Sequence, residues 1–391
     1  MALAAGCGAE QRSTPPPPVA PPAATVSPEP GALANPGALA NPGALANPRT
    51  QPTAGTQQSA PTASSQPPEG QQRPRLSFLA VGDIMLSRQV AQAMRQAGDA
   101  ELPFRGLADR FGAVDFCFAN LESPFSSRDW FSIGPAHNFN TPPAHIQGLV
   151  AHRFSVVTLA NNHALDQGVA GLRFTLGHLD AHGIQHVGAG MDRTAAWQPA
   201  VVEHHGLRVG FVGASYASVN DGGQRRNSYV ARIDQRAELA ATMASLRPRV
   251  DYLAVAMHAG REYLEPVDDA QRDFARRAID LGADVVLGSH PHVAQAVELY
   301  QGKPIFYSLG NFIFDHEPEP TRQGLMVHTT LRAAAASPGS LRRATVERME
   351  LSVVIIHGRS TPRLASPTEA SAVLARIGVA DPIILPRRTD G

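Results

Sequence analysis

Short apolar runs that end in side chains able to bind metal constrain this fold more than any other feature of the sequence. From Leu76 onwards they include LSFLAVGD, DFCFANLE, SVVTLANNH, YLAVAMH and VVLGSHPH. Apolar runs of this length, bounded by polar residues, are typical of buried β-strands. Helix-like stretches lie between them, such as the one that begins at Asp268 and Asp269 and closes on Gly282. Strands alternating with helices predict an α/β fold with largely buried sheets.

The composition divides the chain into a globular domain and flanking segments. Residues 8–74 are dominated by Pro, Ala, Gly, Ser, Thr and Gln, and include three copies of GALANP between Gly31 and Pro48. Such a segment has too few bulky apolar groups to form a core, and its prolines keep it extended. We therefore predict a disordered tether over 8–74, a globular domain over 75–357, and a C-terminal helix and tail over 358–391.

The N-terminal stretch MALAAGC indicates a lipid anchor. Small residues before Cys7 resemble the attachment motif of bacterial lipoproteins, although the charged and most of the apolar part of a signal are missing. We interpret residues 1–7 as a truncated signal remnant with lipidation at Cys7. This predicts a lipid-anchored or secreted protein of the cell envelope. The alternative is a chance cysteine in a disordered N-terminus.

Charge and cysteine content exclude two classes of protein. Acidic and basic residues balance at 34 each, which argues against a surface built to bind nucleic acid. The second cysteine, Cys117, lies in the buried run DFCFANLE, where a thiol behaves as a small apolar group. A disulfide framework is therefore not expected.

The polar residues at the ends of the apolar runs predict a common site. Open α/β sheets bind their ligands at the carboxyl ends of their strands. A mixture of carboxylate, amide and imidazole donors without thiolates suits Mn, Fe or Zn, and we predict one or two divalent ions. The residues concerned are Asp83, Asn120, Glu122, Asn161, Asn162, His163, His258, Glu262, His290 and His292.

Each of these residues also has an ordinary structural explanation. Asp83 could cap a helix, Asn161 and Asn162 could form a turn, and Glu262 could be a solvated charge. The pair His290 and His292 is more specific, because residues at i and i+2 of an extended segment point the same way. Coincidence at five successive strand ends favours one shared metal centre.

The motifs GDIML, ANLESP, ANNHALDQG, HAGREY, GSHPHVAQAVE and YSLGNFIFD, taken in this order, closely resemble the CapA family of bacterial poly-γ-glutamate capsule biosynthesis proteins. That family is similar to the calcineurin-like metallophosphoesterases. The resemblance spans about residues 76–315. It implies a four-layer α/β/β/α sandwich, as a single domain, with a two-metal site along one edge.

The resemblance also implies roles for individual residues. Glu122 would bridge two metals, with Asn162, His258 and His290 completing one shell and Asp83 and His292 holding the other. His163 would donate a proton to the leaving group. Further polar groups would orient the ligands or line the substrate pocket; they are Asn161, Asp166, Glu262, Ser289 and Asn311.

Two departures from the superfamily pattern affect the first metal site. The superfamily has a histidine two residues after its first aspartate, whereas this chain has Met85. The bridging carboxylate is Glu122 instead of aspartate, which has a shorter side chain. Both departures predict a weaker first site or a centre with one metal.

Three functions are compatible with this site. The first is a metal-dependent hydrolase of phosphoesters. The second is a metal-dependent amidase that cleaves a γ-glutamyl polymer or a cell-wall peptide. The third is a non-enzymatic accessory of capsule polymer synthesis or export, which would bind the polymer's carboxylates. The expected partners are the capsule polymer or a small anionic substrate, together with polymer synthase or export proteins.

Overall fold

The computed structural model describes residues 73–128, 130, 138–216, 227–334 and 343–386. The predicted signal remnant with Cys7, and the tether as far as residue 72, lie outside the described residues. Among the helices that the structure describes, none is long and apolar enough to cross a membrane.

The first sheet has nine strands, which come from both the amino-terminal and the carboxyl-terminal parts of the domain. Seven strands form the order β14-β13-β12-β1-β2-β3-β4, while β11 pairs with β1 and β15 pairs with β13. β1, β2, β3 and β4 are parallel neighbours, so their carboxyl ends lie along one edge. The bounds are β1 Arg75–Ile84, β2 Phe116–Leu121, β3 Phe154–Thr158, β4 Gln185–Val187, β11 Asn311–Ile313, β12 Gln323–Ala333, β13 Ala344–His357, β14 Thr361–Leu364 and β15 Ile383–Leu385.

The second sheet has six strands in the order β5-β6-β7-β8-β10-β9. Its central strands β6, β7 and β8 are parallel, which again places their carboxyl ends at one edge. The bounds are β5 Ala200–His204, β6 Leu207–Ser215, β7 Tyr252–His258, β8 Val285–Ser289, β9 Val297–Tyr300 and β10 Lys303–Phe306.

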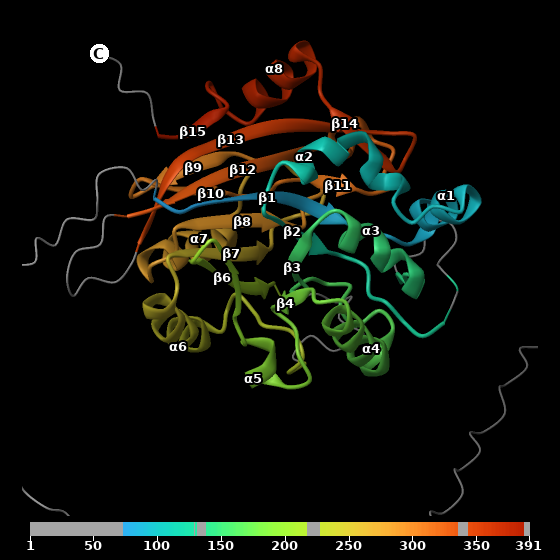
Figure 1. Cartoon of the computed structure of the whole chain (residues 1–391), viewed down its shortest axis with the longest axis horizontal. Helices are drawn as coiled ribbons and strands as arrows, with labels where there is room; N and C mark the ends of the chain where they lie inside the picture. Colours follow the sequence, from blue (N-terminus) through green and yellow to red (C-terminus); the bar gives the residue numbers. More distant parts are fainter. Residues whose placement is uncertain (1–72, 129, 131–137, 217–226, 335–342, 387–391) are drawn as a thin grey trace, which may run out of the picture. The chain divides into compact units, whose positions relative to one another are not determined.

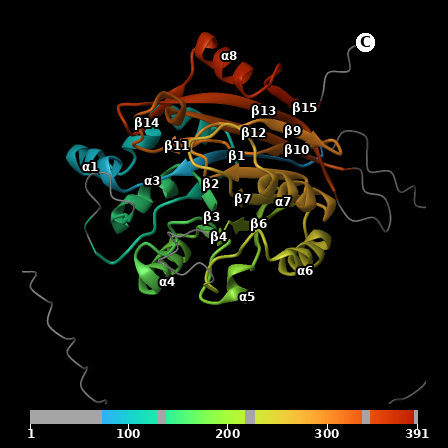
Figure 2. The same cartoon turned by 180° about the vertical axis from the view of Figure 1, so that it is seen from behind.

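Helices cover the outer faces of both sheets, as Figures 1 and 2 show. One hydrophobic cluster joins the first sheet to the helices on its outer face, and another joins the second sheet to α6 and α7. The helices on the first sheet are α1 Arg88–Ala97, α2 Ala108–Gly112, α3 Ile146–Ala151 and α4 Gly168–Ala181. Those on the second are α5 Arg193–Ala196, α6 Arg236–Leu246 and α7 Asp269–Asp280.

The core between the two sheets is rich in aromatic side chains. Phe118 of β2 stacks on Phe211 of β6 with ring centroids 5.2 Å apart, and Phe78 and Tyr252 lie in the same cluster. Since the side chains of both inner faces are apolar, the sheets pack face to face. The predicted four-layer α/β/β/α sandwich is confirmed.

The carboxyl-terminal segment is more regular than a helix and a tail. It contains the expected helix, α8 (Pro367–Arg376), which starts with a capping box between Ser366 and Glu369. It also contributes β14 and β15, which both pair with β13. β14 pairs with residues 354–357 of β13, and β15 pairs with residues 349 and 350. Both short strands supply hydrogen-bond partners for backbone groups of β13, so the carboxyl-terminal segment continues the sheet.

The segment between β10 and β11 crosses from the second sheet to the first. The amide of Leu309 donates to the carbonyl of Gly288 beside β8, and the carbonyl of Gly310 accepts from the amide of Asp83 in β1. The sheets approach closely here: a Cβ at Gly82 would lie 1.8 Å from the Gly310 oxygen. The ends of β1 and β8 are thereby brought to one place.

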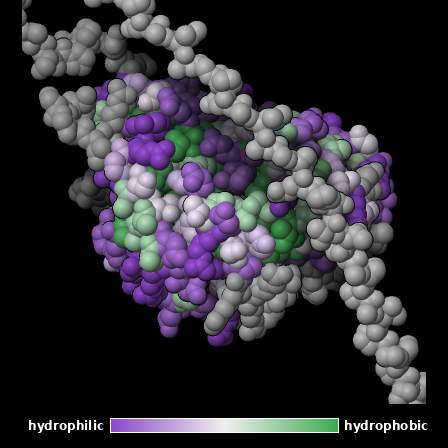
Figure 3. Space-filling model, turned by 90° about the horizontal axis from the view of Figure 1, so that it is seen from below, coloured by the Kyte–Doolittle hydropathy of each residue, from purple (hydrophilic) through white to green (hydrophobic). Residues whose placement is uncertain are grey.

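Figure 3 shows the domain from below, on the side of α4, α5 and α6. Where described residues are visible, hydrophobic groups form small patches separated by hydrophilic ones. Such a pattern is ordinary for a protein surface in contact with water.

Candidate metal centre

Two groups of buried side chains could each hold a metal ion. The first consists of Glu122, His258 and His290, and the second of Asp83, Glu122 and His292. Within each group, the candidate ligand atoms lie within 4.8 Å of one another. Glu122 belongs to both groups, so its carboxylate lies where a bridging ligand would be needed.

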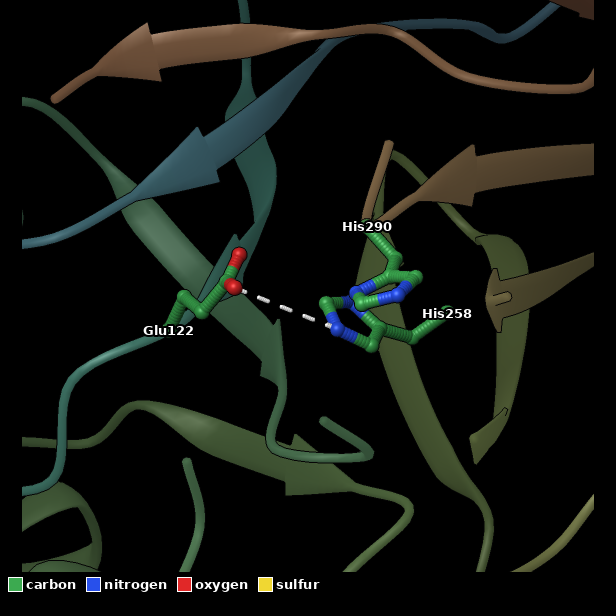
Figure 4. Close-up of side chains that lie close together, drawn as sticks. All are labelled: Glu122, His258 and His290. Atoms are coloured by element: carbon green, nitrogen blue, oxygen red, sulfur yellow. Dashed lines mark ion pairs between the residues drawn. The ribbon is translucent and has the colours of Figure 1, made fainter. Parts of the chain in front are cut away.

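The ligands come from both sheets and face one another across the edge of the sandwich. Asp83 lies at the end of β1, and Glu122 follows β2 in the first sheet. His258 ends β7, while His290 follows β8 in the second sheet. Figure 4 shows Glu122 pointing towards the two imidazoles, with 3.9 Å between its Oε1 and the His258 Nε2.

The expected extended conformation of His290 and His292 is wrong. Both lie in a turn after β8 with positive φ angles, 99° for His290 and 58° for His292. Positive φ is uncommon for residues other than glycine, and it persists where surrounding contacts hold it. The turn sends the two rings to different groups, with centroids 6.3 Å apart. The imidazoles therefore serve two adjacent positions.

Asn120, which the sequence places among the polar residues of the predicted site without a specific role, connects the two carboxylates. Its Nδ2 donates to Asp83 Oδ1 at 2.8 Å and to Glu122 Oε2 at 3.0 Å. Its Oδ1 accepts from Asn161 Nδ2 at 3.0 Å. The signal that could have indicated this linking role is its position two residues before Glu122, on the same face of the strand.

The loop after β3 places Asn162 and His163 beside the centre. Asn162 Oδ1 lies 2.8 Å from His258 Nε2, and Asn161 Oδ1 accepts from the His163 amide at 3.1 Å. His163 Nδ1 lies 2.7 Å from Asp166 Oδ2. The carboxylate orients the imidazole and leaves the His163 Nε2 as the ring atom available to a substrate.

Ser289 and Asn311 orient ligand imidazoles, a role that outer polar groups often take at metal sites. Ser289 Oγ lies 2.9 Å from His258 Nδ1, and Asn311 Oδ1 lies 2.9 Å from His292 Nδ1. In both rings the opposite nitrogen, Nε2, is left facing Glu122. Glu262 differs, since it is exposed in the loop after β7.

Burial sets the charges of these groups in the metal-free protein. Burial raises the pKa of the Glu122 carboxyl well above its ordinary value, and the neighbouring Asp83 carboxylate raises it further. Burial also lowers the pKa of His258 and His290 well below the usual range, and nearby imidazoles add to the effect. Neutral imidazole is the form that binds metal, so both rings are ready to act as ligands.

Several polar atoms at the centre have no hydrogen-bond partner although they are buried. They include Asp83 Oδ2, Glu122 Oε1 and His290 Nδ1. Unpaired buried oxygen and nitrogen atoms are costly, and most native proteins avoid them. A cation bound here would provide the missing partner, so the donor set fits a divalent ion.

Comparison with known protein families shows which family the chain belongs to. Residues 77–316 match the family model of the bacterial capsule synthesis protein PGA_cap, which covers all of the candidate ligands. The chain belongs to the PGA_cap family.

Several relatives carry names that refer to PGA, capsule or polyglutamine synthesis. The PGA_cap chain is 31% identical over 259 residues to the PGA biosynthesis protein CapA of Bacillus subtilis, with 66% of this chain and 68% of that protein covered. It is 28% identical to the capsule biosynthesis protein CapA of Bacillus anthracis, with 67% and 65% covered. A "Probable polyglutamine synthesis accessory protein" of Mycobacterium tuberculosis is 30% identical, with 62% and 75% covered.

Solved structures with similar folds include nucleotidases. The 5'-nucleotidase precursor of Thermus thermophilus has a TM-score of 0.42 at 15% identity, with 78% of this chain and 58% of that chain covered. The NAD nucleotidase of Haemophilus influenzae has a TM-score of 0.43 at 12% identity, with 79% and 56% covered.

In this PGA_cap chain the residue two positions after Asp83 is a core residue, Met85. The Met85 side chain is fully buried in the hydrophobic cluster under the first sheet. Its sulfur accepts from the Ser87 amide at 3.1 Å. The second group therefore has three candidate ligands, Asp83, Glu122 and His292, without a residue from position 85.

We expect His290→Ala in this PGA_cap protein to lower the metal content without abolishing it. The first group would lose a nitrogen ligand, while Asp83, Glu122 and His292 would remain in place. Metal analysis after dialysis against Mn or Zn should show a stoichiometry reduced by about one ion per chain. His205→Ala, in the turn between β5 and β6 away from the centre, is the control. An unchanged metal content in His290→Ala would contradict the assignment.

Proposed function

We propose that this protein is a metal-dependent hydrolase of the cell envelope that acts on an anionic substrate of capsule metabolism. The observation that carries the proposal is the shared position of Glu122 between two groups of metal-binding side chains. The envelope location rests on the capsule biosynthesis names of the relatives and on the lipid attachment predicted at Cys7.

The proposed metal ligands divide into two sets. Glu122, Asn162, His258 and His290 would hold one ion, and Asp83, Glu122 and His292 would hold the other. A divalent cation in such a site lowers the pKa of a bound water and neutralises negative charge that develops during hydrolysis. Burial keeps the imidazoles of His258 and His290 neutral, which is the form that binds a metal.

His163 is the proposed proton donor. Water would add to the phosphorus or carbonyl carbon of the substrate after giving a proton to the solvent, and the bond to the leaving oxygen or nitrogen would break. The leaving atom then takes a proton from His163 Nε2. Asp166 holds the opposite ring nitrogen and fixes the orientation of the ring. The position of Phe139 against the imidazole, with centroids 4.1 Å apart, limits rotation of the ring.

We expect His163→Ala to lower kcat by about 10²–10⁴-fold while bound metal is retained, since proton transfer by a positioned side chain contributes that much. The assay compares an activated aryl phosphodiester with a γ-linked glutamate oligomer, which separates phosphoesterase from amidase activity. His290→Ala is the parallel variant that disturbs metal binding. Activity that survives both substitutions would contradict the proposal.

A second candidate is a non-enzymatic accessory of polymer synthesis or export. The accessory name of the Mycobacterium tuberculosis relatives favours it. In that case the bound cations would hold carboxylates of the polymer, and the polymer synthase or exporter would be the partner. Loss of polymer from cells that carry His290→Ala, together with no turnover of either substrate by the wild type, would favour this candidate.

A further inference from the structure

We propose that Arg88 is a positioning residue that holds the His163–Asp166 pair in its active geometry through the segment Phe139–Asn140. This inference rests on the proposed role of His163. It concerns a contact path that starts in the turn between β1 and α1, outside the metal ligands themselves.

Arg88 is a buried cation held between two aromatic rings. Its guanidinium carbon lies 4.9 Å from the centroid of the Phe139 ring and 5.6 Å from that of Phe314. Its Nη2 is paired with the carboxylate of Asp315, and the residue is only 7% exposed. A desolvated cation against aromatic faces fixes the position of both rings.

The two rings lead directly to the site. Phe139 stacks on the His163 imidazole with centroids 4.1 Å apart, and Phe314 lies 4.7 Å from the ring of His292. Arg88 is therefore separated from the proposed proton donor by one aromatic ring. Movement of Arg88 would release the packing on that face of His163.

Backbone hydrogen bonds follow the same path. The amide of Phe139 donates to Asp166 Oδ2 at 2.6 Å, the oxygen that also lies against His163 Nδ1. The next residue, Asn140, is bonded through both its carbonyl and its amide to Ser87 Oγ, at 2.8 and 3.2 Å. Ser87 thus hydrogen-bonds to Asn140 and Arg88 packs on Phe139. The amide of Phe139 in turn hydrogen-bonds to Asp166.

The backbone of Arg88 supports a role beyond starting a helix. Its φ angle is 46°, in the left-handed region, although Arg88 is the first residue of the right-handed helix α1. Such a conformation persists where contacts on all sides hold it. Asp315 supplies some of these contacts, because its second oxygen accepts from the Gln89 amide at 3.2 Å.

Hydrogen exchange in the metal-loaded full-length protein tests this without an assay of activity. In Arg88→Ala, the amides of Phe139 and Asn140 should exchange at least about tenfold faster, because local opening becomes easier. The amides of β7 should keep their wild-type rates. In Arg88→Lys, the exchange rates at Phe139 and Asn140 should lie between those of the wild type and those of Arg88→Ala, since an ammonium keeps the charge but lacks the planar guanidinium. Arg193→Ala, which breaks an exposed pair with Glu238, is the control.

The kinetic counterpart is a fall in kcat of roughly 10–100-fold in Arg88→Ala with KM nearly unchanged, the scale of a small misplacement of a catalytic group. Wild-type exchange at Phe139 and Asn140 would overturn the inference even if His163→Ala confirms the proton donor. Full activity of His163→Ala would instead defeat the proposed function and leave the exchange result standing. If Arg88→Ala does not fold, Arg88→Lys and Asp315→Asn decide, with wild-type exchange in both overturning the inference.

Discussion

Glu122→Gln is expected to raise the free energy of unfolding of the chelator-treated protein at neutral pH, by about 1–3 kcal/mol. The reason is that Glu122 is fully buried beside Asp83, and one of its oxygens has no hydrogen-bond partner. Burial and the neighbouring Asp83 disfavour ionisation of this carboxyl in the folded protein, and glutamine has no proton to take up on folding. Urea unfolding of the metal-free proteins measures the difference, and Glu203→Gln on the exposed side of β5 is the control.

The pH dependence of this gain has a definite sign. Burial and Asp83 raise the pKa of the Glu122 carboxyl in the folded protein. Wild-type stability is therefore fully present below the unfolded-state pKa of about 4.3 and is lost as the pH rises through the folded-state value. The advantage of the variant should vanish near pH 4 and grow towards neutral pH. A constant difference across this range would contradict the explanation.

Addition of metal should reverse the order of stability. Wild-type protein should gain about 2.7 kcal/mol when the free metal concentration is 100 times the dissociation constant. Glu122→Gln should gain little, because the amide lacks the negative charge that both groups share. A variant that is more stable without metal and less stable with it would identify Glu122 as a residue retained for binding.

Gly82→Ala is expected to destabilise the protein by about 3 kcal/mol or more and to remove its metal. A Cβ at this position would lie 1.8 Å from the Gly310 oxygen, which accepts a hydrogen bond from the Asp83 amide. Backbone atoms must move to make room, so β1 and the segment that crosses between the sheets would separate. That movement displaces Asp83 from the other ligands.

Gly112→Ala provides a matched control for this substitution. Gly112 ends α2, and nothing lies within 4 Å of the position where its Cβ would be. The change should be neutral or slightly stabilising, because alanine favours helix more than glycine does. Thermal unfolding and metal analysis of the two variants make the comparison. Wild-type values for both measurements in Gly82→Ala would show that the close approach of the strands is not required.

The layered fold and the neighbourhood of the ligands were predictable because both follow from strand direction. Each apolar run was short, and each ended in a donor side chain. Since β1 and β2 run parallel, Asp83 and Glu122 meet at one edge, and since β7 and β8 run parallel, His258 and His290 meet at another. Facing sheets then bring both edges together, which is a general property of this layering.

The finer arrangement depends on contacts between segments far apart in the chain, so local patterns did not show it. In the turn that separates His290 from His292, both histidines have positive φ angles, which histidine rarely adopts and which the sequence does not indicate. Asn120 acquires its role from Asp83 and Asn161, which lie on neighbouring segments. The sequence gives no sign of the role proposed for Arg88, since its partners Phe139 and Asp315 lie 51 and 227 positions further along.

The order of the proposed ligands along the chain has a consequence for how the protein acquires its metal. Oxygen donors, from Asp83, Glu122 and Asn162, all precede residue 200, whereas the nitrogen donors His258, His290 and His292 all follow it. Of this ligand set, a partly synthesised chain thus offers only the oxygen donors. The complete mixed set of ligands exists only after the two halves of the domain have packed together. Selectivity among competing cations therefore depends on the folded protein and on the metal ions available in the compartment where folding is completed.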